Sequence, residues 1–105
     1  MFACSFMFVP GNLDDEFFAL DSVIDDYARS LDGFVGVDRW WSEDKKARNV
    51  VYFFQDKETV SQFAQFPDHV KAKKEYAKWY QAYHVVISEV TATYGDGRMT
   101  GLTLS

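Results

Sequence analysis

The sequence predicts an α+β fold in which helices cover one face of a four-stranded antiparallel sheet. Three observations support this prediction. Four runs are rich in aromatic and β-branched residues, an amphipathic helical pattern separates the first two runs, and further helical patterns precede the last. The order of strand, helix, strand, strand, helix, strand is that of the ferredoxin-like plait. At 105 residues the chain has the length of one domain. We expect this domain to span residues 1–95 and a C-terminal tail to follow over residues 96–105.

The first strand is predicted over residues 2–9, which are apolar at nearly every position. A strand that is apolar on both faces is expected to be covered on both faces. Pro10 and Gly11 end it. Asn12 then supplies the N-cap of an amphipathic helix that ends before Gly33. The apolar residues of this helix recur at spacings of three and four, and they are Leu13, Phe17, Leu20, Ile24, Tyr27, Ala28 and Leu31.

Two further strands are predicted over residues 34–41 and 49–55. The polar segment 42–48 between them is short, so we expect these strands to form an antiparallel hairpin. Asp56 then caps a short helix that carries Phe63 on its apolar side. The hairpin and this helix complete the middle of the plait.

A longer helix is predicted to begin at Pro67 and continue to Tyr83, before a last strand over residues 84–94. With about 3.6 residues per turn, one stripe of this helix contains His69, Ala72, Tyr76, Trp79, Tyr80 and Tyr83. Lysines occupy the opposite side. His84, at the junction with the strand, is expected to cap the last turn. The glycine-containing tail is expected to extend to a neighbouring subunit or to stay mobile.

The aromatic content of the chain is high. Hydrophobic residues make up 48% of the sequence and aromatic residues 18%. One small core cannot readily bury this much aromatic area, so the excess is expected to cover a partner subunit, to line a ligand cavity, or to do both. Helices cover only one face of a plait, whereas these strands are apolar on both. We therefore predict a homodimer in which two sheets pack face to face and form a barrel-like core.

Composition also disfavours several classes of protein. A formal charge of −5 argues against nucleic-acid binding, which depends on cations that neutralise phosphates. No run approaches the roughly 18 apolar residues of a membrane span, and the first residues lack a basic region typical of signal peptides, so a cytoplasmic location is expected. Cys4 is the only cysteine, and its apolar surroundings predict a buried, unreactive thiol. The two histidines lack the spacing of metal ligands, and we expect no metal and no cofactor.

Three segments carry a resemblance to a known family: GFVGV at residues 33–37, PDH at residues 67–69 and WYQAYHVVISEV at residues 79–90. With the first strand and helix, they make residues 2–95 similar to the antibiotic biosynthesis monooxygenase (ABM) domain family, whose members are small dimeric α/β-barrel proteins. The resemblance implies the plait and the dimer. It also implies a range of activities, because some members oxidise polycyclic aromatic compounds with dioxygen and no cofactor, whereas others degrade haem.

The haem-degrading branch of that family has an asparagine on the first strand, a tryptophan on the short helix and a histidine deeper in the following helix. The matching positions here hold Phe6, Phe63 and Lys73. A lysine ammonium cannot coordinate iron, and a phenylalanine ring has no hydrogen-bonding group. The resemblance therefore favours oxygenation without haem, and haem binding or degradation stays as an alternative.

His69 is the residue on which a catalytic prediction depends. We expect it at the lip of a cavity between the helices and the sheet. An imidazole titrates near neutrality, so His69 can take a proton from a phenol or an activated carbon acid, with Tyr76 or Tyr80 as hydrogen-bond donor. The alternative is structural: a half-buried His69 that hydrogen-bonds a backbone carbonyl, among aromatic residues that only pack.

Aromatic side chains are expected to line this cavity and to stack on a flat polyphenolic substrate. The expected wall residues are Phe6, Trp40, Tyr52, Phe54, Phe63, Phe66, Trp79 and Tyr83. Trp40 and Trp41 are neighbours on one strand and point to opposite faces, so only one can contribute, and the sequence does not decide which. The predicted function is monooxygenation of a small aromatic compound with dioxygen. The alternative from another class is a ligand-binding or stress-related dimer without catalysis.

Overall fold

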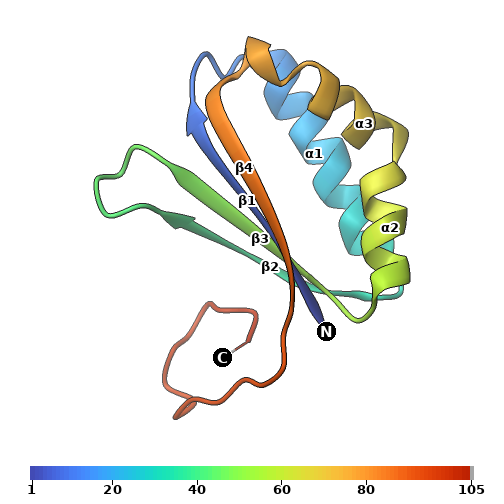
Figure 1. Cartoon of the computed structure of the whole chain (residues 1–105), viewed down its shortest axis with the longest axis vertical. Helices are drawn as coiled ribbons and strands as arrows, with labels where there is room; N and C mark the ends of the chain where they lie inside the picture. The colour runs from blue at the N-terminus through green and yellow to red at the C-terminus, as the bar shows by residue number, and fades with distance from the viewer. Residues whose placement is uncertain (105) are drawn as a thin grey trace.

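The computed structural model describes residues 1–104 and contains a four-stranded antiparallel sheet with its helices on one face (Figure 1). The strands lie in the order β2-β3-β1-β4. In chain order the elements are β1 (Phe2–Pro10), α1 (Asp15–Ser30), β2 (Phe34–Trp41), β3 (Arg48–Phe54), α2 (Lys57–Gln65), α3 (Pro67–Lys74), the 3₁₀ helix η1 (Tyr76–Lys78) and β4 (Tyr80–Glu89). This is the predicted plait, including the antiparallel hairpin of β2 and β3. Within residues 1–104, no helix has the length and apolar character needed to cross a membrane.

The strand register sorts the side chains of the sheet onto two faces. One row across the sheet faces the helices and consists of Val37, Tyr52, Cys4 and Ile87. The next row points away from the helices and consists of Asp38, Val51, Ser5 and Val86. We call the side of this second row the open face, because no helix covers it (Figure 1).

The core lies between the helices and the middle of the sheet. Phe54 of β3 and Ala28 of α1 are fully buried, and the Phe63 ring of α2 lies 5.3 Å from the Phe54 ring, centroid to centroid. Thr59 of α2 packs directly on Gly33, where any Cβ would overlap the threonine side chain. A glycine at this position therefore lets the start of α2 approach the start of β2.

The N-cap of α1 is Asp14 and not the predicted Asn12. One carboxylate oxygen of Asp14 accepts hydrogen bonds from the backbone N–H of Phe17 at 2.9 Å and from the indole N–H of Trp79 at 3.0 Å. Trp79 is distant from Asp14 in the sequence, so no local capping pattern includes this second hydrogen bond. The predicted apolar face of the helix is confirmed, because the buried residues of α1 are Phe17, Ile24 and Ala28.

The predicted long helix over residues 67–83 is wrong in its second half. α3 ends at Lys74, η1 follows, and β4 already begins at Tyr80. From Tyr80 onward the chain pairs with β1 as a strand instead of continuing as a helix. The carbonyl of fully buried Trp79 also accepts a 2.7 Å hydrogen bond from the Gly11 N–H. These contacts satisfy the backbone groups that a longer helix would have paired internally.

His84 lies within β4, opposite Met7 of β1, and not at the end of a helix. The predicted capping role is therefore wrong. Alternation along the strand places the exposed His84 side chain on the open face, away from the helices.

The C-terminal tail curls back, and its residue Thr103 contacts the chain's own sheet (Figure 1). The backbone N–H of Thr103 donates to the Asp38 carboxylate at 2.9 Å, and its hydroxyl donates to the Val37 carbonyl at 3.2 Å. Gly36 makes room for this contact, since any Cβ there would overlap the Thr103 side chain. The tail was expected to reach a neighbour or stay mobile; Thr103 instead contacts β2 and covers part of the open face there.

Candidate functional site

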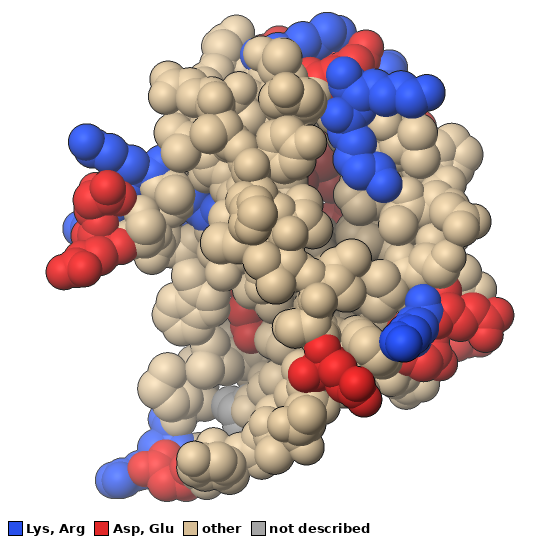
Figure 2. Space-filling model, in the orientation of Figure 1, with Lys and Arg blue, Asp and Glu red and all other residues tan. Residues whose placement is uncertain are grey.

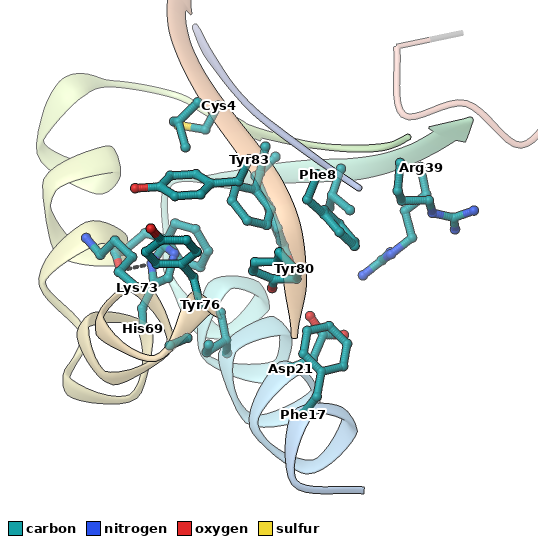
Figure 3. A pocket seen from close by; sticks show the side chains of 18 of the residues that line it. Cys4, Phe8, Phe17, Asp21, Arg39, His69, Lys73, Tyr76, Tyr80 and Tyr83 are labelled. Atoms are coloured by element: carbon teal, nitrogen blue, oxygen red, sulfur yellow. Dashed lines mark hydrogen bonds between the residues drawn. The ribbon is translucent and has the colours of Figure 1, made fainter. Parts of the chain in front are cut away.

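A cavity of about 540 Å³ lies between the helices and the helix-facing side of the sheet (Figure 3). All four strands and all three α-helices contribute side chains to its lining, most of them aromatic or aliphatic. Phe6, Phe8 and Tyr80 form what we call the aromatic wall, with ring centroids between 4.7 and 5.4 Å apart. The volume and lining are typical of sites for small organic molecules.

The side of the cavity formed by β4 is open to solvent. Three cavity-lining side chains of this strand are strongly exposed: Tyr83 at 48%, Val85 at 46% and Ile87 at 57%. Figure 2 shows an uncharged surface over the middle of β4. An apolar molecule can therefore reach the cavity across an apolar rim.

His69 reaches the cavity from α3 and is held by one hydrogen bond (Figure 3). Its Nδ1 lies 3.0 Å from the backbone carbonyl oxygen of Phe63. A carbonyl can only accept, so the neutral imidazole carries its proton on Nδ1 and donates it there. The basic lone pair is then on Nε2, to which residues 1–104 donate no hydrogen bond. This is the hydrogen bond to a backbone carbonyl that the structural alternative expected, and it leaves Nε2 available as the basic nitrogen.

Burial lowers the pKa of His69 from its ordinary value of 6.5. The hydrogen bond to Phe63 opposes this change, and the positive charge of Lys73 adds to it. His69 is therefore neutral at pH 7 and able to accept a proton.

This shift in pKa predicts a titration that can be measured. The ring protons of His69, followed by NMR, should titrate with a midpoint below 6.5. Between that midpoint and 6.5 the unfolded chain binds a proton that the folded chain does not. The contribution of His69 to the free energy of unfolding is therefore complete above pH 6.5, and it is lost as the pH falls through the pKa of His69 in the folded protein. A titration midpoint above pH 6.5 would show that burial does not control the pKa of His69.

The three tyrosines predicted to share a helical stripe with His69 do line the cavity, but they come from different elements. Tyr76 of η1 and Tyr83 of β4 have ring centroids 4.7 Å apart. Tyr80 belongs to the aromatic wall, and burial, with the negative charge of Asp21, raises the pKa of its hydroxyl. Tyr80 thus stays protonated at neutral pH and can donate a hydrogen bond.

Half of the eight predicted wall residues line the cavity, namely Phe6, Tyr52, Phe63 and Tyr83. Three of the others pack elsewhere. Phe54 is fully buried within the core. Phe66 stacks on Tyr27 with a centroid distance of 3.9 Å. Trp79 is fully buried and meets the Phe17 ring edge-on at 5.7 Å. Their aromatic area stabilises the fold and is not available to a ligand.

Trp41, and not Trp40, lines the cavity. In the hairpin, Trp41 pairs with Arg48, which is also a cavity residue, whereas Trp40 pairs with Asn49 on the open face. The register of β2 against β3 therefore decides what the sequence left undecided. The prediction of Trp40 as a wall residue is wrong, because its side chain points away from the helices and is 48% exposed.

Three charged residues that were not predicted at the site also line the cavity, namely Asp21, Arg39 and Arg48. Burial raises the pKa of Asp21. The signal for Asp21 was present, because it follows Phe17 by four positions and so lies beside the apolar face of α1. The two arginines share a face of the hairpin with Trp41, so they could be placed only once the direction of Trp41 was known.

Asp25 of α1 fixes several polar groups beside the cavity. Its carboxylate accepts hydrogen bonds from Arg29 at 2.7 Å, from the Tyr52 hydroxyl at 2.8 Å and from Arg39 at 3.2 Å. Burial opposes the charge of Asp25, but these three bonds lower its pKa overall. Tyr52 therefore offers the cavity its ring, because its hydroxyl is already used.

Cys4 is partly buried and lines the cavity. Burial raises the pKa of its thiol to about 11, so the thiol is protonated and unreactive at neutral pH, as predicted. Within residues 1–104, no group of three or more His, Cys, Asp or Glu side chains is placed to hold a metal ion.

Comparison of the sequence with protein-family models gave no match, and comparison with curated proteins gave none. Solved structures do match. Rv0793 from Mycobacterium tuberculosis superimposes with a TM-score of 0.72 at 14% identity, over 90% of this chain and 98% of that one. SnoaB from Streptomyces nogalater, a cofactor-independent oxygenase, superimposes with a TM-score of 0.68 at 11% identity, over 88% and 94% of the two chains.

A candidate antibiotic biosynthesis monooxygenase from Deinococcus radiodurans gives a TM-score of 0.72 at 9% identity, over 90% of this chain and 97% of that one. Identities this low establish a shared fold and not a shared reaction. The chain therefore has the fold of the antibiotic biosynthesis monooxygenases, as the resemblance of its sequence predicted.

Proposed function

We propose that the protein is a cofactor-independent monooxygenase that oxidises a flat phenolic substrate with dioxygen. The observation that supports this most is a neutral histidine, His69, which lines an aromatic cavity and whose Nε2 has no hydrogen-bond partner among residues 1–104. A shared fold with SnoaB, a cofactor-independent oxygenase, is consistent with this reaction. The volume of the cavity and its apolar lining suit a fused-ring compound.

In this mechanism His69 is the general base. The aromatic wall stacks on the substrate rings and excludes water, while Nε2 removes a proton from a phenol or from an activated methylene carbon. Tyr76 or Tyr80 donates a hydrogen bond to the oxygen on which negative charge develops. The substrate anion then reduces dioxygen. With an anthrone-like methylene, one oxygen atom becomes the new carbonyl and the other leaves as water with the two methylene hydrogens.

Oxygen uptake tests this proposal. The purified protein, without added metal or cofactor, is expected to consume dioxygen with anthrone or a hydroxylated naphthacene and to form the corresponding quinone in equal amount. Binding of such a compound without oxygen uptake would support the ligand-binding alternative instead.

Haem titration tests the other alternative. Phe6, Phe63 and Lys73 all line the cavity, and the Lys73 ammonium donates to the Ala64 carbonyl at 2.9 Å. None of these three side chains offers iron a ligand, so they do not fit the haem-degrading arrangement. We expect no change in the Soret band, and a sharp shift that saturates at one haem per subunit would favour haem chemistry.

We also propose that two chains form a homodimer through their open faces. Trp40 and Val86 are apolar, lie on this face and are 48% and 42% exposed. Thr103 covers a different part of the face, near Gly36 and Asp38. A second copy of the same face would bury the remaining apolar side chains.

Val86→Glu is expected to convert this dimer into monomers, because it would bury a carboxylate without a partner in the interface. Light scattering at micromolar concentration should give the mass of two subunits for the wild type and of one subunit for the variant. Val23→Glu is the matched control, since Val23 of α1 is 44% exposed on the other side of the molecule, and it should stay dimeric. A wild-type mass of one subunit would contradict the proposed dimer.

A further inference from the structure

The cavity has a second polar end that the proposed mechanism does not use. His69 and Lys73 lie at one end, and Figure 3 shows Arg39 on the opposite side of the cavity. Arg48 lies close to Arg39 on the sheet. Arg48 pairs with Trp41, and Trp41 is two positions after Arg39 on the same face of β2. This second end therefore carries two guanidinium groups beside an indole ring.

Arg48 is a cation without an acidic partner among residues 1–104. Its guanidinium carbon lies 4.9 Å from the centroid of the Trp41 ring, and the residue is half-buried in the cavity lining. Within residues 1–104, no carboxylate lies within ion-pair distance of Arg48, whereas every other arginine contacts an aspartate. Contact with an aromatic ring limits the motion of the guanidinium plane and leaves its N–H groups able to bind an anion.

The charges around this end do not cancel. Of the charged side chains that line this end of the cavity, Arg39 and Arg48 are cations and Asp21 is an anion, which leaves one positive charge. Asp25, next to this end, accepts hydrogen bonds from Arg29 and Arg39. Its negative charge therefore balances those two cations and not Arg48. The chain as a whole has a net charge of −5, so this local excess of positive charge is opposite to the overall balance.

We propose that Arg48, with Arg39 beside it, binds a carboxylate of the ligand, and that the substrate is an aromatic acid. The carboxylate lies at the β2–β3 end, the fused rings contact the aromatic wall, and the ring that is oxidised lies near His69. A guanidinium can hold a carboxylate through two parallel hydrogen bonds, which sets the direction of the ligand. This inference rests on the proposed function, because both place the substrate in the same cavity.

A pair of probes of equal size tests the carboxylate site. 2-Naphthoate carries the charge, and 2-naphthamide replaces it with a neutral amide. Calorimetric titration of the full-length protein at pH 7 is expected to show about tenfold tighter binding of the naphthoate, the usual effect of a hydrogen bond to a charged group. Arg48→Gln should remove this preference and leave the affinity for the amide unchanged. Lys71→Gln, on the exposed side of α3, makes the same charge change and should keep the preference.

Further variants make the outcome decisive. Arg48→Lys keeps the charge without the two-pronged geometry and should retain only part of the preference, with a circular dichroism spectrum like that of the wild type. If Lys73→Gln removed the preference and Arg48→Gln did not, the carboxylate would bind at the His69 end and the proposal would be wrong. Equal binding of both probes, or binding of neither, would also overturn it.

The two proposals fail separately. Oxygen uptake with anthrone needs no carboxylate, so equal affinity for the two probes would leave the oxygenase proposal in place. A clear preference for naphthoate without oxygen uptake would keep the Arg48 site and remove the oxygenase.

Discussion

Replacing His69 with alanine is expected to lower kcat/KM for anthrone oxidation by about 100-fold or more, the usual effect of losing a general base. His69 supplies an imidazole that burial keeps neutral at pH 7 and whose Nε2 has no protein partner in residues 1–104. Oxygen uptake measures the change. His84→Ala is the matched control, because the His84 side chain points away from the cavity and does not line it, and its rate should stay within about twofold of the wild type.

His69→Asn separates catalysis from packing. An asparagine amide can donate to the Phe63 carbonyl, as Nδ1 of His69 does at 3.0 Å, but it does not accept a proton near neutral pH. We expect this variant to fold normally and to be as slow as the alanine variant. Wild-type activity in His69→Asn would give His69 a structural role only and would make Asp21, whose pKa burial raises, the next candidate for the base.

Replacing Phe54 with alanine is expected to lower the free energy of unfolding by about 3–5 kcal/mol. Phe54 has no exposed surface. Its ring lies 6.3 Å from Phe34, 6.1 Å from Tyr52 and 5.3 Å from Phe63, measured between centroids. These neighbours belong to three different elements, so they cannot all move to fill the space that the ring leaves.

Urea unfolding measures this loss, with all proteins at one subunit concentration so that dimer formation does not bias the comparison. The control is Phe18→Ala, which removes the same atoms from a side chain that is 55% exposed on α1. Its effect should stay below about 1 kcal/mol. Similar losses for the two variants would mean that Phe54 is not central to the core.

Local patterns were sufficient for most of the elements. The apolar spacing of α1 is confirmed by buried Phe17, Ile24 and Ala28, and the N-cap Asp56 and the N1 residue Pro67 mark the starts of α2 and α3 as predicted. Each of these signals connects residues within one or two turns of a helix, so the sequence contains all the information that they need.

The segment after Lys74 shows where local patterns fail. Tyr76, Tyr80 and Tyr83 fit the spacing of a helical stripe, yet the last two belong to β4. The choice depends on pairing with β1 and on Trp79, whose indole bonds to Asp14 and whose carbonyl bonds to Gly11. These partners are more than sixty positions away, and no window of sequence includes both sides of the contact.

By itself, the sequence determined the class of fold, the order of its elements, and His69 as the histidine of the helix-side cavity. The tertiary structure decided that Trp41 and not Trp40 lines that cavity and that Asp21 and Arg48 join it. It also decided that Nδ1 of His69 bonds to a backbone carbonyl, while Nε2 has no partner among residues 1–104. Periodicity and capping act between near neighbours in the chain, whereas strand register and the burial of individual atoms depend on the packing of distant segments.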